Sequence, residues 1–192
     1  MPRVAGNATT YNLPEDESYI NVYLNGGTYG GVNVTSWYST WSQTLPANES
    51  SKILTNHLWN VGLVGYTKNQ KIATDITQEK AYTWQGTVGL MSAVEYVRAS
   101  TNTACAGVYN YRATSGCYSS GATHNYLFKS ENGWTITPLS GAAINQAWGP
   151  SSTYIYYNRS VVSAYNVRPA LYLSSTTVLT GDGTIENKYK IS

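Results

Sequence analysis

One short strand constrains the fold of this chain more than any other segment. Residues 167–173 read Val-Arg-Pro-Ala-Leu-Tyr-Leu, a run of apolar and bulky residues of strand length. Because side chains alternate along a strand, Val167, Pro169, Leu171 and Leu173 are expected on one face, and Arg168, Ala170 and Tyr172 on the other. Pro169 has no N–H to donate, so it belongs at the start of the strand or on a sheet edge. The pattern predicts a strand that runs into the core.

The segment before this strand is dense in tyrosine. Residues 148–166 combine Trp148 with four tyrosines among small polar residues, and the whole chain holds 18 Tyr and 6 Trp but only 1 Phe. Tyr and Trp keep a polar group that can stay solvated while the ring makes contacts. Charged residues make up 11% and hydrophobic residues 42% of the chain. This composition is typical of folded, β-rich exported domains and recognition surfaces, and not of disordered chains.

The charge and hydropathy of the chain exclude several kinds of partner. The net charge is +2 and no basic block occurs, so the electrostatic field that gathers nucleic acid is missing. The first residues, 1–19, contain neither the apolar region nor the cleavage site of a signal peptide. No transmembrane span is visible in the sequence either, and we expect no direct membrane insertion by this chain. We expect an extracellular or cell-surface location, with the export or anchoring segment outside this sequence.

The two cysteines, Cys105 and Cys117, are separated by eleven residues. No Cys-x-x-Cys motif or histidine-flanked pair occurs, which disfavours a zinc site or a thioredoxin-like redox pair. In an exported protein a disulfide between them is the better interpretation, and it would stabilise the fold by about 3 kcal/mol through loop closure. The alternative is a pair of reduced, partly buried thiols in a cytosolic protein.

The first third of the chain contains one ambiguous element and one charged segment. Residues 1–16 have the features of a lead-in, and 17–25 fit either a helix or a strand, since Ile20 and Leu24 match both periods. Residues 48–66 predict a helical turn followed by an apolar strand through Val64. Residues 66–83 are the most charged stretch and are expected to form a surface loop or exposed hairpin.

A helix start follows the strand that contains Val88 and Leu90. Ser92 stands three residues before Glu95, the spacing of a capping box, in which each side chain bonds the other residue's backbone N–H. We therefore expect a short helix after Ser92. Further along, Asn132-Gly133 predicts a turn into a strand at Trp134, and the sequence around Gly181 predicts a hairpin near the C-terminus.

Four motifs in this order carry a resemblance to a known family. They are "HLWNVG", "WQGTVGLMSAVEYVRAS", "NYLFKSENGWTITPLS" and "NVRPALYLSSTTVLTGDGTIENKYKI". The chain resembles uncharacterised domains in exported and surface-attached, including pilin-like, proteins of Gram-positive bacteria, and its ending is similar to the Arg-Pro strand of C-type-lectin-like folds. The resemblance implies a β-rich α+β fold of the C-type-lectin-like kind, with short helices around a mostly antiparallel sheet. It implies residues 48–192 as this domain, and 1–47 as a lead-in with first elements that partly join the same compact unit.

The same resemblance implies where a ligand would bind. In C-type-lectin-like folds the segment before the last core strand is displayed on the ligand-facing surface, whereas Arg168 and Pro169 are structural. The expected ligand-binding residues are Trp148, Tyr154, Tyr156, Tyr157, Asn158 and Tyr165. The alternative is that these tyrosines alternate in a two-sided sheet and cover the edges of the core.

No constellation for catalysis is evident in the sequence. Nucleophile elbows, HExxH, phosphate loops and dinucleotide-binding motifs are all absent. His57 stands next to the apolar residues Leu58 and Trp59 and is expected to be structural. Asp75 and Glu79 are expected in the charged loop. Glu95 is engaged in a helix cap and Asp182 lies in a turn. We expect no catalytic residues, no metal site, no cofactor and no enzyme activity.

Two functions remain open on the sequence alone. The first is an adhesion or ligand-binding module on a bacterial envelope protein or pilus, whose Tyr, Trp and Asn side chains engage a glycan or a protein. The second is a structural pilin-like subunit that packs into a homo-oligomer or pilus. Low net charge and exposed aromatic rings suit both.

Overall fold

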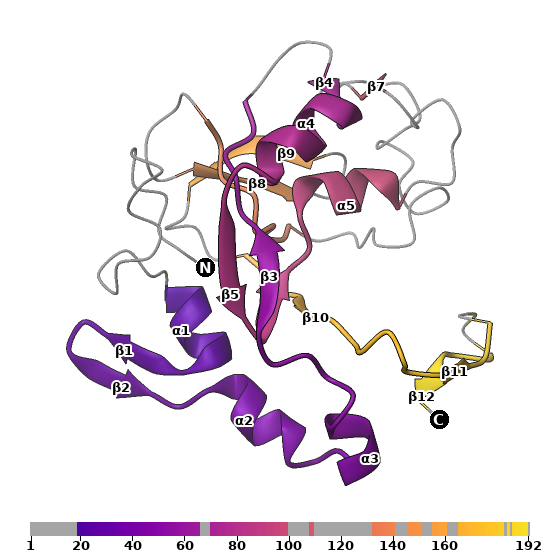
Figure 1. Ribbon diagram of the computed structural model, residues 1–192. Coiled ribbons are helices and arrows are strands. Elements are labelled where there is room, and N and C mark those ends of the chain that lie inside the picture. The colour runs from indigo at the N-terminus through magenta and orange to yellow at the C-terminus, as the bar shows by residue number, and fades with distance from the viewer. Residues whose placement is uncertain are drawn as a thin grey trace.

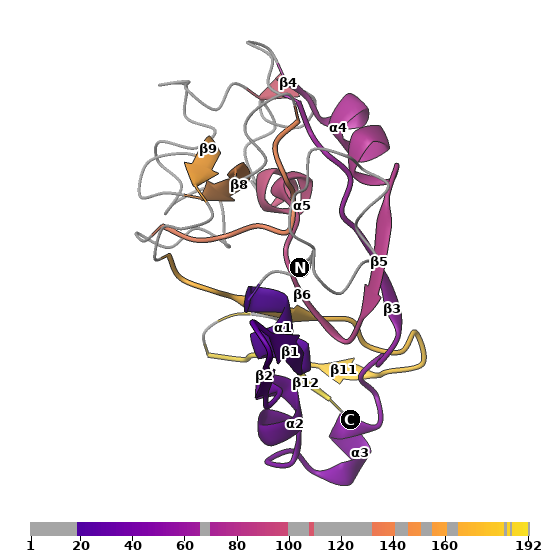
Figure 2. The ribbon, with the colours of Figure 1, turned by 90° about the vertical axis from the view of Figure 1, so that its left-hand side faces the viewer.

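The computed structural model of the chain describes residues 19–65, 70–99, 108–109, 132–140, 146–150, 155–160, 165–182, 184 and 186–191. In these residues helices and short antiparallel strand pairs alternate along the chain, so the fold is α+β. The views in Figures 1 and 2 show α1, α2, α3 and the β1–β2 hairpin at one end of the molecule. Helices α4 and α5 and strands β8 and β9 lie at the other end, and β3 and β5 span the middle.

The ambiguous stretch near the N-terminus is a helix. Helix α1 (Tyr19–Asn25) buries Asn21, Val22 and Leu24, which lie on one side at helical spacing. The Asn25 side chain then bonds the backbone of Val88 in both directions, at 2.8 Å to its carbonyl oxygen and 2.9 Å from its N–H. These two bonds fasten the N-terminal elements to the rest of the molecule.

A tight hairpin and two short helices follow α1. Strands β1 (Gly27–Tyr29) and β2 (Val32–Val34) pair antiparallel across Gly30 and Gly31, whose φ angles of 58° and 81° a two-residue hairpin turn requires. Helix α2 (Trp37–Ser42) begins at Ser36, whose hydroxyl oxygen accepts the N–H of Ser39 at 3.1 Å. Helix α3 (Ala47–Ser50) is a single turn.

Two antiparallel pairs form the centre of the molecule. Strand β3 (His57–Asn60) pairs with β5 (Thr83–Gly86) so that Trp59 lies opposite Trp84. Strand β6 (Val88–Leu90) pairs with β10 (Pro169–Leu171), and β6 leads directly into α5 (Ala93–Arg98).

The described part of the charged stretch, residues 70–83, contains a helix with two buried acids where a surface loop or exposed hairpin was expected. Strand β4 (Gln70–Lys71) pairs with β7 (Val108–Tyr109), and α4 (Ile72–Glu79) follows β4 at once. The prediction was wrong for residues 70–83, because 72–79 form α4 and this helix turns its two acids inward: Asp75 is 1% exposed and Glu79 is 5% exposed. Residues 66–69 lie outside the described part of the chain.

A fully buried, extended segment forms single β-bridges with separate parts of the chain. Residues 133–139 are all buried and make isolated bridges to Val64, Ala147 and Asn166. Trp134 belongs to this segment, but the bridges are single, so no regular strand begins there as expected. Strand β8 (Gln146–Pro150) runs beside the segment and pairs with β9 (Ile155–Ser160).

The C-terminal hairpin projects from the body of the molecule. Strands β11 (Leu179–Thr180) and β12 (Lys190–Ile191) pair antiparallel, and Figure 1 shows them at the far side from β1 and β2. The hairpin predicted around Gly181 is therefore present, with a loop longer than a tight turn between its strands.

The main core forms where these elements meet. Its buried members come from α1, β3 and the residue after it, β5, β6, the segment 133–139 and β8. They are Leu24, Trp59, Val61, Trp84, Val88, Leu90, Trp134, Ile136 and Ala147. Strand β10 packs beside this core and does not run through it: Val167, Ala170 and Leu171 are half-buried and Pro169 is exposed. The expectation that the strand over 167–173 runs into the core was wrong. Its described residues are half-buried or exposed: β10 pairs with β6, and Tyr172 and Leu173 pair with Leu54 and Ile53 at the border of the core.

No helix in the described ranges is both long and apolar enough to cross a membrane.

Candidate ligand-binding groove

An open groove lies between helix α5 and the strands β3 and β10. Its volume is about 480 Å³, within the range of small-molecule sites in proteins. The described residues that line it combine apolar, aromatic and charged groups: Trp59, Met91, Glu95, Arg98, Ala99, Ala170, Leu171 and Tyr172. A ligand in this groove would therefore meet aromatic rings and two opposite charges at the same time.

The charged groups of the groove are positioned by the capping box of α5. The Ser92 hydroxyl accepts the N–H of Glu95 at 3.1 Å, and the Ser92 N–H donates to Oε2 of Glu95 at 2.7 Å. The opposite face of the helix is fixed in the protein by the buried side chains of Val94 and Val97. Glu95 and Arg98, three residues apart, therefore lie on the exposed face of a helix that is held at both its start and its side.

Trp59 forms the floor of the groove, and its indole ring packs directly against Gly89, which has no side chain to obstruct it. A Cβ on Gly89 would come within 2.5 Å of Cε3 of Trp59, so only glycine leaves room for the indole ring across β6. The indole N–H donates to the carbonyl oxygen of Gly86 at 3.0 Å. Trp59 is 4% exposed, which makes it a rigid base and not a mobile contact.

Tyr172 forms an aromatic wall that is held from two sides. The imidazole ring of His57 stacks on its ring at 3.6 Å between centroids, and Trp59 meets it edge to face at 5.0 Å. The Tyr172 hydroxyl donates to Oε1 of Glu95 at 3.1 Å. The ring nevertheless remains 37% exposed, so it is a preorganised aromatic surface at the groove.

Burial determines the protonation states of this aromatic group. It lowers the pKa of His57 below its ordinary value, although the negative charge of Glu95 acts in the opposite direction. Burial, followed by the charge of Glu95 and the hydrogen bond to it, raises the pKa of Tyr172 to about 12. At neutral pH a neutral imidazole therefore stacks on a protonated phenol that donates to Glu95.

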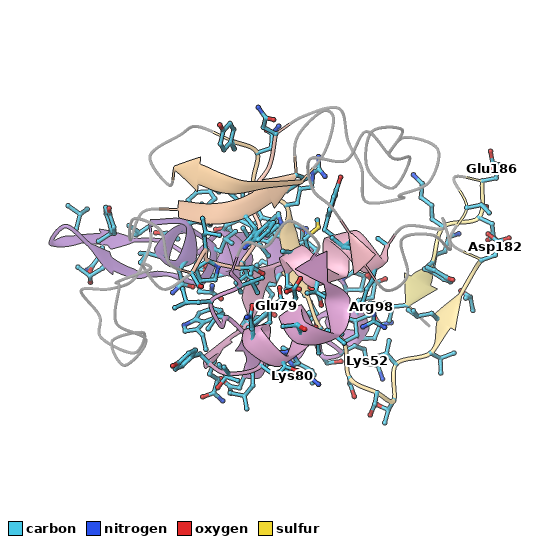
Figure 3. The ribbon with its side chains drawn as sticks, turned by 90° about the horizontal axis from the view of Figure 1, so that it is seen from above. Lys52, Glu79, Lys80, Arg98, Asp182 and Glu186 are labelled. Atoms are coloured by element: carbon cyan, nitrogen blue, oxygen red, sulfur yellow. The ribbon has the colours of Figure 1, made fainter. Side chains whose placement is uncertain are left out.

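Arg98 is the cation of the groove. It lies in the last turn of α5 and is exposed. Figure 3 shows it on the side of the molecule from which the β11–β12 hairpin projects, whereas Glu79 lies among the helices. Among the described residues, no hydrogen bond or ion pair engages its guanidinium group, which leaves its donors for a ligand.

A buried acid supports α5 from beneath. Oε1 of Glu79 accepts the Thr137 hydroxyl at 2.6 Å and the N–H of Val94 at 3.3 Å, and Thr137 accepts the N–H of Ala93 at 2.9 Å. Glu79 and Thr137 therefore satisfy backbone donors at the start of α5. Burial raises the pKa of Glu79 from 4.5 to about 7, partly opposed by these hydrogen bonds.

The expected tyrosine surface differs from this groove, and one of its members is buried. Trp148 is 0% exposed, and its indole N–H donates to the carbonyl oxygen of Val64 at 3.1 Å. The expectation that Trp148 faces solvent was wrong because segment 133–139 covers β8 and Val64 takes up the polar group of the ring.

The remaining members of that surface are placed only in part. Tyr165 is half-buried and its ring lies 5.0 Å from that of Trp134, at the border of the core. Tyr156, Tyr157 and Asn158 lie in β9, where the structure describes the backbone alone. Tyr154 and the cysteine pair, Cys105 and Cys117, lie outside the described residues.

The two structural residues of the last strand are described. Pro169 is the first residue of β10, a position at which its missing N–H is tolerated, and it lies opposite Leu90. Arg168 is half-buried. Burial raises the pKa of the Tyr96 hydroxyl to about 12, and the positive charge of Arg168 acts in the opposite direction and lowers it.

Sequence reasoning named some residues of the groove, never as one group, and it missed Arg98. Glu95 was identified only as a cap, His57 only as a structural residue, and Tyr172 only by its face of the last strand. In the described part of the chain no three His, Cys, Asp or Glu side chains are placed to hold a metal ion. Known protein families, curated proteins and solved structures give no match to this chain.

Proposed function

We propose that this chain is a non-enzymatic, extracellular binding module of the C-type-lectin-like kind, displayed on a bacterial envelope protein or pilus. Its ligand is a saccharide that binds in the groove between α5 and β10. The observation that carries the proposal is the half-exposed, firmly held ring of Tyr172 beside the charged pair Glu95 and Arg98.

The chemistry of the groove suits a sugar. The flat ring of Tyr172 can pack against the apolar C–H face of a pyranose, and the groove volume of about 480 Å³ accommodates one or two sugar units. The carboxylate of Glu95 holds one donor on each oxygen, which leaves lone pairs for ligand hydroxyl groups. Low net charge and a tyrosine-rich composition accord with such a surface.

The same contacts support a binding role over catalysis. Both oxygens of Glu95 fix backbone or side-chain donors, so this carboxylate has a positioning role. The other acid near α5, Glu79, is 5% exposed and bonds the backbone at the start of the helix. A hydrolase that uses two carboxylates needs both of them at the substrate.

The test is a glycan-array and cell-wall-polysaccharide screen with two matched tyrosine variants. Tyr172→Ala removes the wall of the groove, whereas Tyr189→Ala removes a tyrosine that is 61% exposed on the C-terminal hairpin. We expect Tyr172→Ala to weaken binding by at least about tenfold, equivalent to about 1.4 kcal/mol, and Tyr189→Ala to leave it unchanged. Equal effects of the two variants, or no glycan bound, would overturn the proposal.

A second function is favoured by a separate observation. Val178, Leu179 and Tyr189 are 61%, 46% and 61% exposed on or beside the projecting β11–β12 hairpin. Such an apolar surface fits a pilin-like subunit that packs against copies of itself. Sedimentation velocity over a range of concentrations tests it: assembly that Leu179→Asn abolishes supports the structural role, and a monomer at all concentrations excludes it.

A further inference from the structure

The groove pairs an unengaged cation with hydrogen-bond acceptors, which limits the ligands it favours. The guanidinium group of Arg98 has five N–H donors, and among the described residues none of them is engaged. The planar guanidinium matches a carboxylate with two parallel hydrogen bonds. A neutral sugar has no carboxylate to accept these two hydrogen bonds, so the guanidinium would donate to water.

From these contacts we infer that the groove selects acidic saccharides, in which a sugar carboxylate binds Arg98. This inference rests on the proposed function and names the class of its ligand. The ring of the same sugar packs on Tyr172, and its hydroxyl groups donate to the carboxylate of Glu95.

Glu95 determines which acidic ligands fit. Its negative charge lies one helical turn from Arg98, so it opposes a ligand that carries negative charge over its whole surface. An acidic sugar complements both residues. Its carboxylate lies on one side of the molecule and can bind Arg98, while its hydroxyl groups donate to Glu95. A carboxylate ligand without hydroxyl groups gains only the contact with Arg98.

Arg98 is exposed, so its contribution depends on the geometry of the contact and not on burial. Two parallel hydrogen bonds from the planar guanidinium to one carboxylate are stronger than a single contact between neutral groups.

The test compares each acid with its own neutral derivative. Methyl β-D-glucuronide and N-acetylmuramic acid are titrated by NMR against the full chain, each beside its methyl ester, at pH 7 and low salt. The ester keeps the ring and hydroxyl groups and replaces the charged carboxylate by a neutral methoxycarbonyl group. We expect each acid to bind at least about tenfold more tightly than its ester, since a charge-assisted hydrogen bond is worth about 1.5 kcal/mol or more.

Two variants assign the preference to its residue. Arg98→Gln removes the guanidinium from an exposed position, and Lys80→Gln removes a positive charge from an exposed position outside the groove. We expect the preference for the acid to vanish in Arg98→Gln and to remain in Lys80→Gln. N-acetylphenylalanine, a carboxylate without hydroxyl groups, should bind more weakly than the glucuronide.

The outcomes separate this inference from the proposed function. Equal binding of acid and ester by the wild-type protein would overturn the inference and leave saccharide binding in place. A preference that survives in Arg98→Gln, or is lost equally in Lys80→Gln, would overturn it as well. Tighter binding of N-acetylphenylalanine than of the glucuronide would indicate a peptide-type ligand, and failure of all saccharides to bind would overturn both.

Discussion

At the scale of single residues, a few side chains decide the geometry of the groove. Gly89 makes room for the indole ring of Trp59, and Trp59 in turn contacts the ring of Tyr172. The hydroxyl group of Tyr172 then reaches Glu95 on the helix. Because each contact fixes the next, a change beneath Trp59 is expected to alter the groove without touching a residue of its surface.

The first prediction concerns Gly89→Ala. The new methyl group would lie 2.5 Å from Cε3 of Trp59, so the ring has to shift, and we expect the free energy of unfolding to fall by about 1–3 kcal/mol. Urea unfolding measures this loss. Gly65→Ala is the control, since its nearest neighbour is the side-chain oxygen of Ser140 at 3.2 Å, which can rotate away. Equal stability of the two variants would contradict the role of Gly89.

The second prediction concerns the pH dependence of stability through Glu79. The folded protein holds the proton of Glu79 up to a pKa of about 7, whereas the unfolded chain releases it near 4.5. The folded state therefore binds more protons between these values, and the contribution of Glu79 to stability falls as pH rises through that window. The predicted loss from pH 4.5 to 7 is about 3 kcal/mol.

Glu79→Gln tests this dependence. The amide keeps an oxygen that accepts from Thr137 and Val94 but does not titrate. Urea unfolding at pH 5 and pH 8 should show that the wild-type protein loses stability relative to this variant as the pH rises. A difference between the two proteins that stays constant with pH would show that Glu79 titrates alike in the folded and unfolded chains.

At the scale of elements, local sequence signals account for where some helices and strands begin. They do not show which other elements those helices and strands pack against. The pair Ser92 and Glu95 identified the start of α5, and Pro169, expected at a strand start or a sheet edge, is the first residue of β10. The sequence did not show that α4 turns Asp75 and Glu79 inward, because their partners on α5 and on segment 133–139 are distant along the chain. For the same reason Trp148 was misplaced: the carbonyl of Val64 that holds it is 84 residues away.

The third prediction concerns the attachment of α1. The Asn25 side chain both donates to and accepts from the backbone of Val88. Asn25→Ala leaves both groups without this partner, and we expect a loss of about 2 kcal/mol in the free energy of unfolding. Asn33→Ala, which removes an exposed amide on β2, should cost less than about 0.5 kcal/mol. Similar values for the two variants in urea unfolding would show that Asn25 does not anchor the helix.

At the scale of the whole molecule, the groove exists because separate parts of the chain meet at α5. Trp59 comes from β3, Glu95 and Arg98 from α5, and Tyr172 from the residue after β10. Residue types alone predicted a binding surface rich in aromatic rings, yet they could not identify which rings converge. The groove depends on pairings between distant strands, such as β6 with β10, which leave no periodic signal in the sequence.

The fourth prediction concerns Cys105 and Cys117, which lie outside the described residues. If they form a disulfide, the intact mass is lower by the mass of two hydrogen atoms than after reduction. No thiol should then react under denaturing conditions before reductant is added. Reduction should lower stability by about 3 kcal/mol. Two reactive thiols in freshly prepared, unreduced protein would indicate a reduced pair.

The most direct measurement for the groove is an NMR titration that follows the six tryptophan indole N–H signals with methyl β-D-glucuronide. Trp59 is the tryptophan among the described lining residues, whereas Trp148 is buried against Val64 and serves as an internal reference. We predict saturable shifts of the Trp59 indole signal and of the Glu95 and Arg98 amides, with Trp148 unchanged. Binding that shifts other signals and leaves Trp59 in place, or no binding at all, would contradict a saccharide site in this groove.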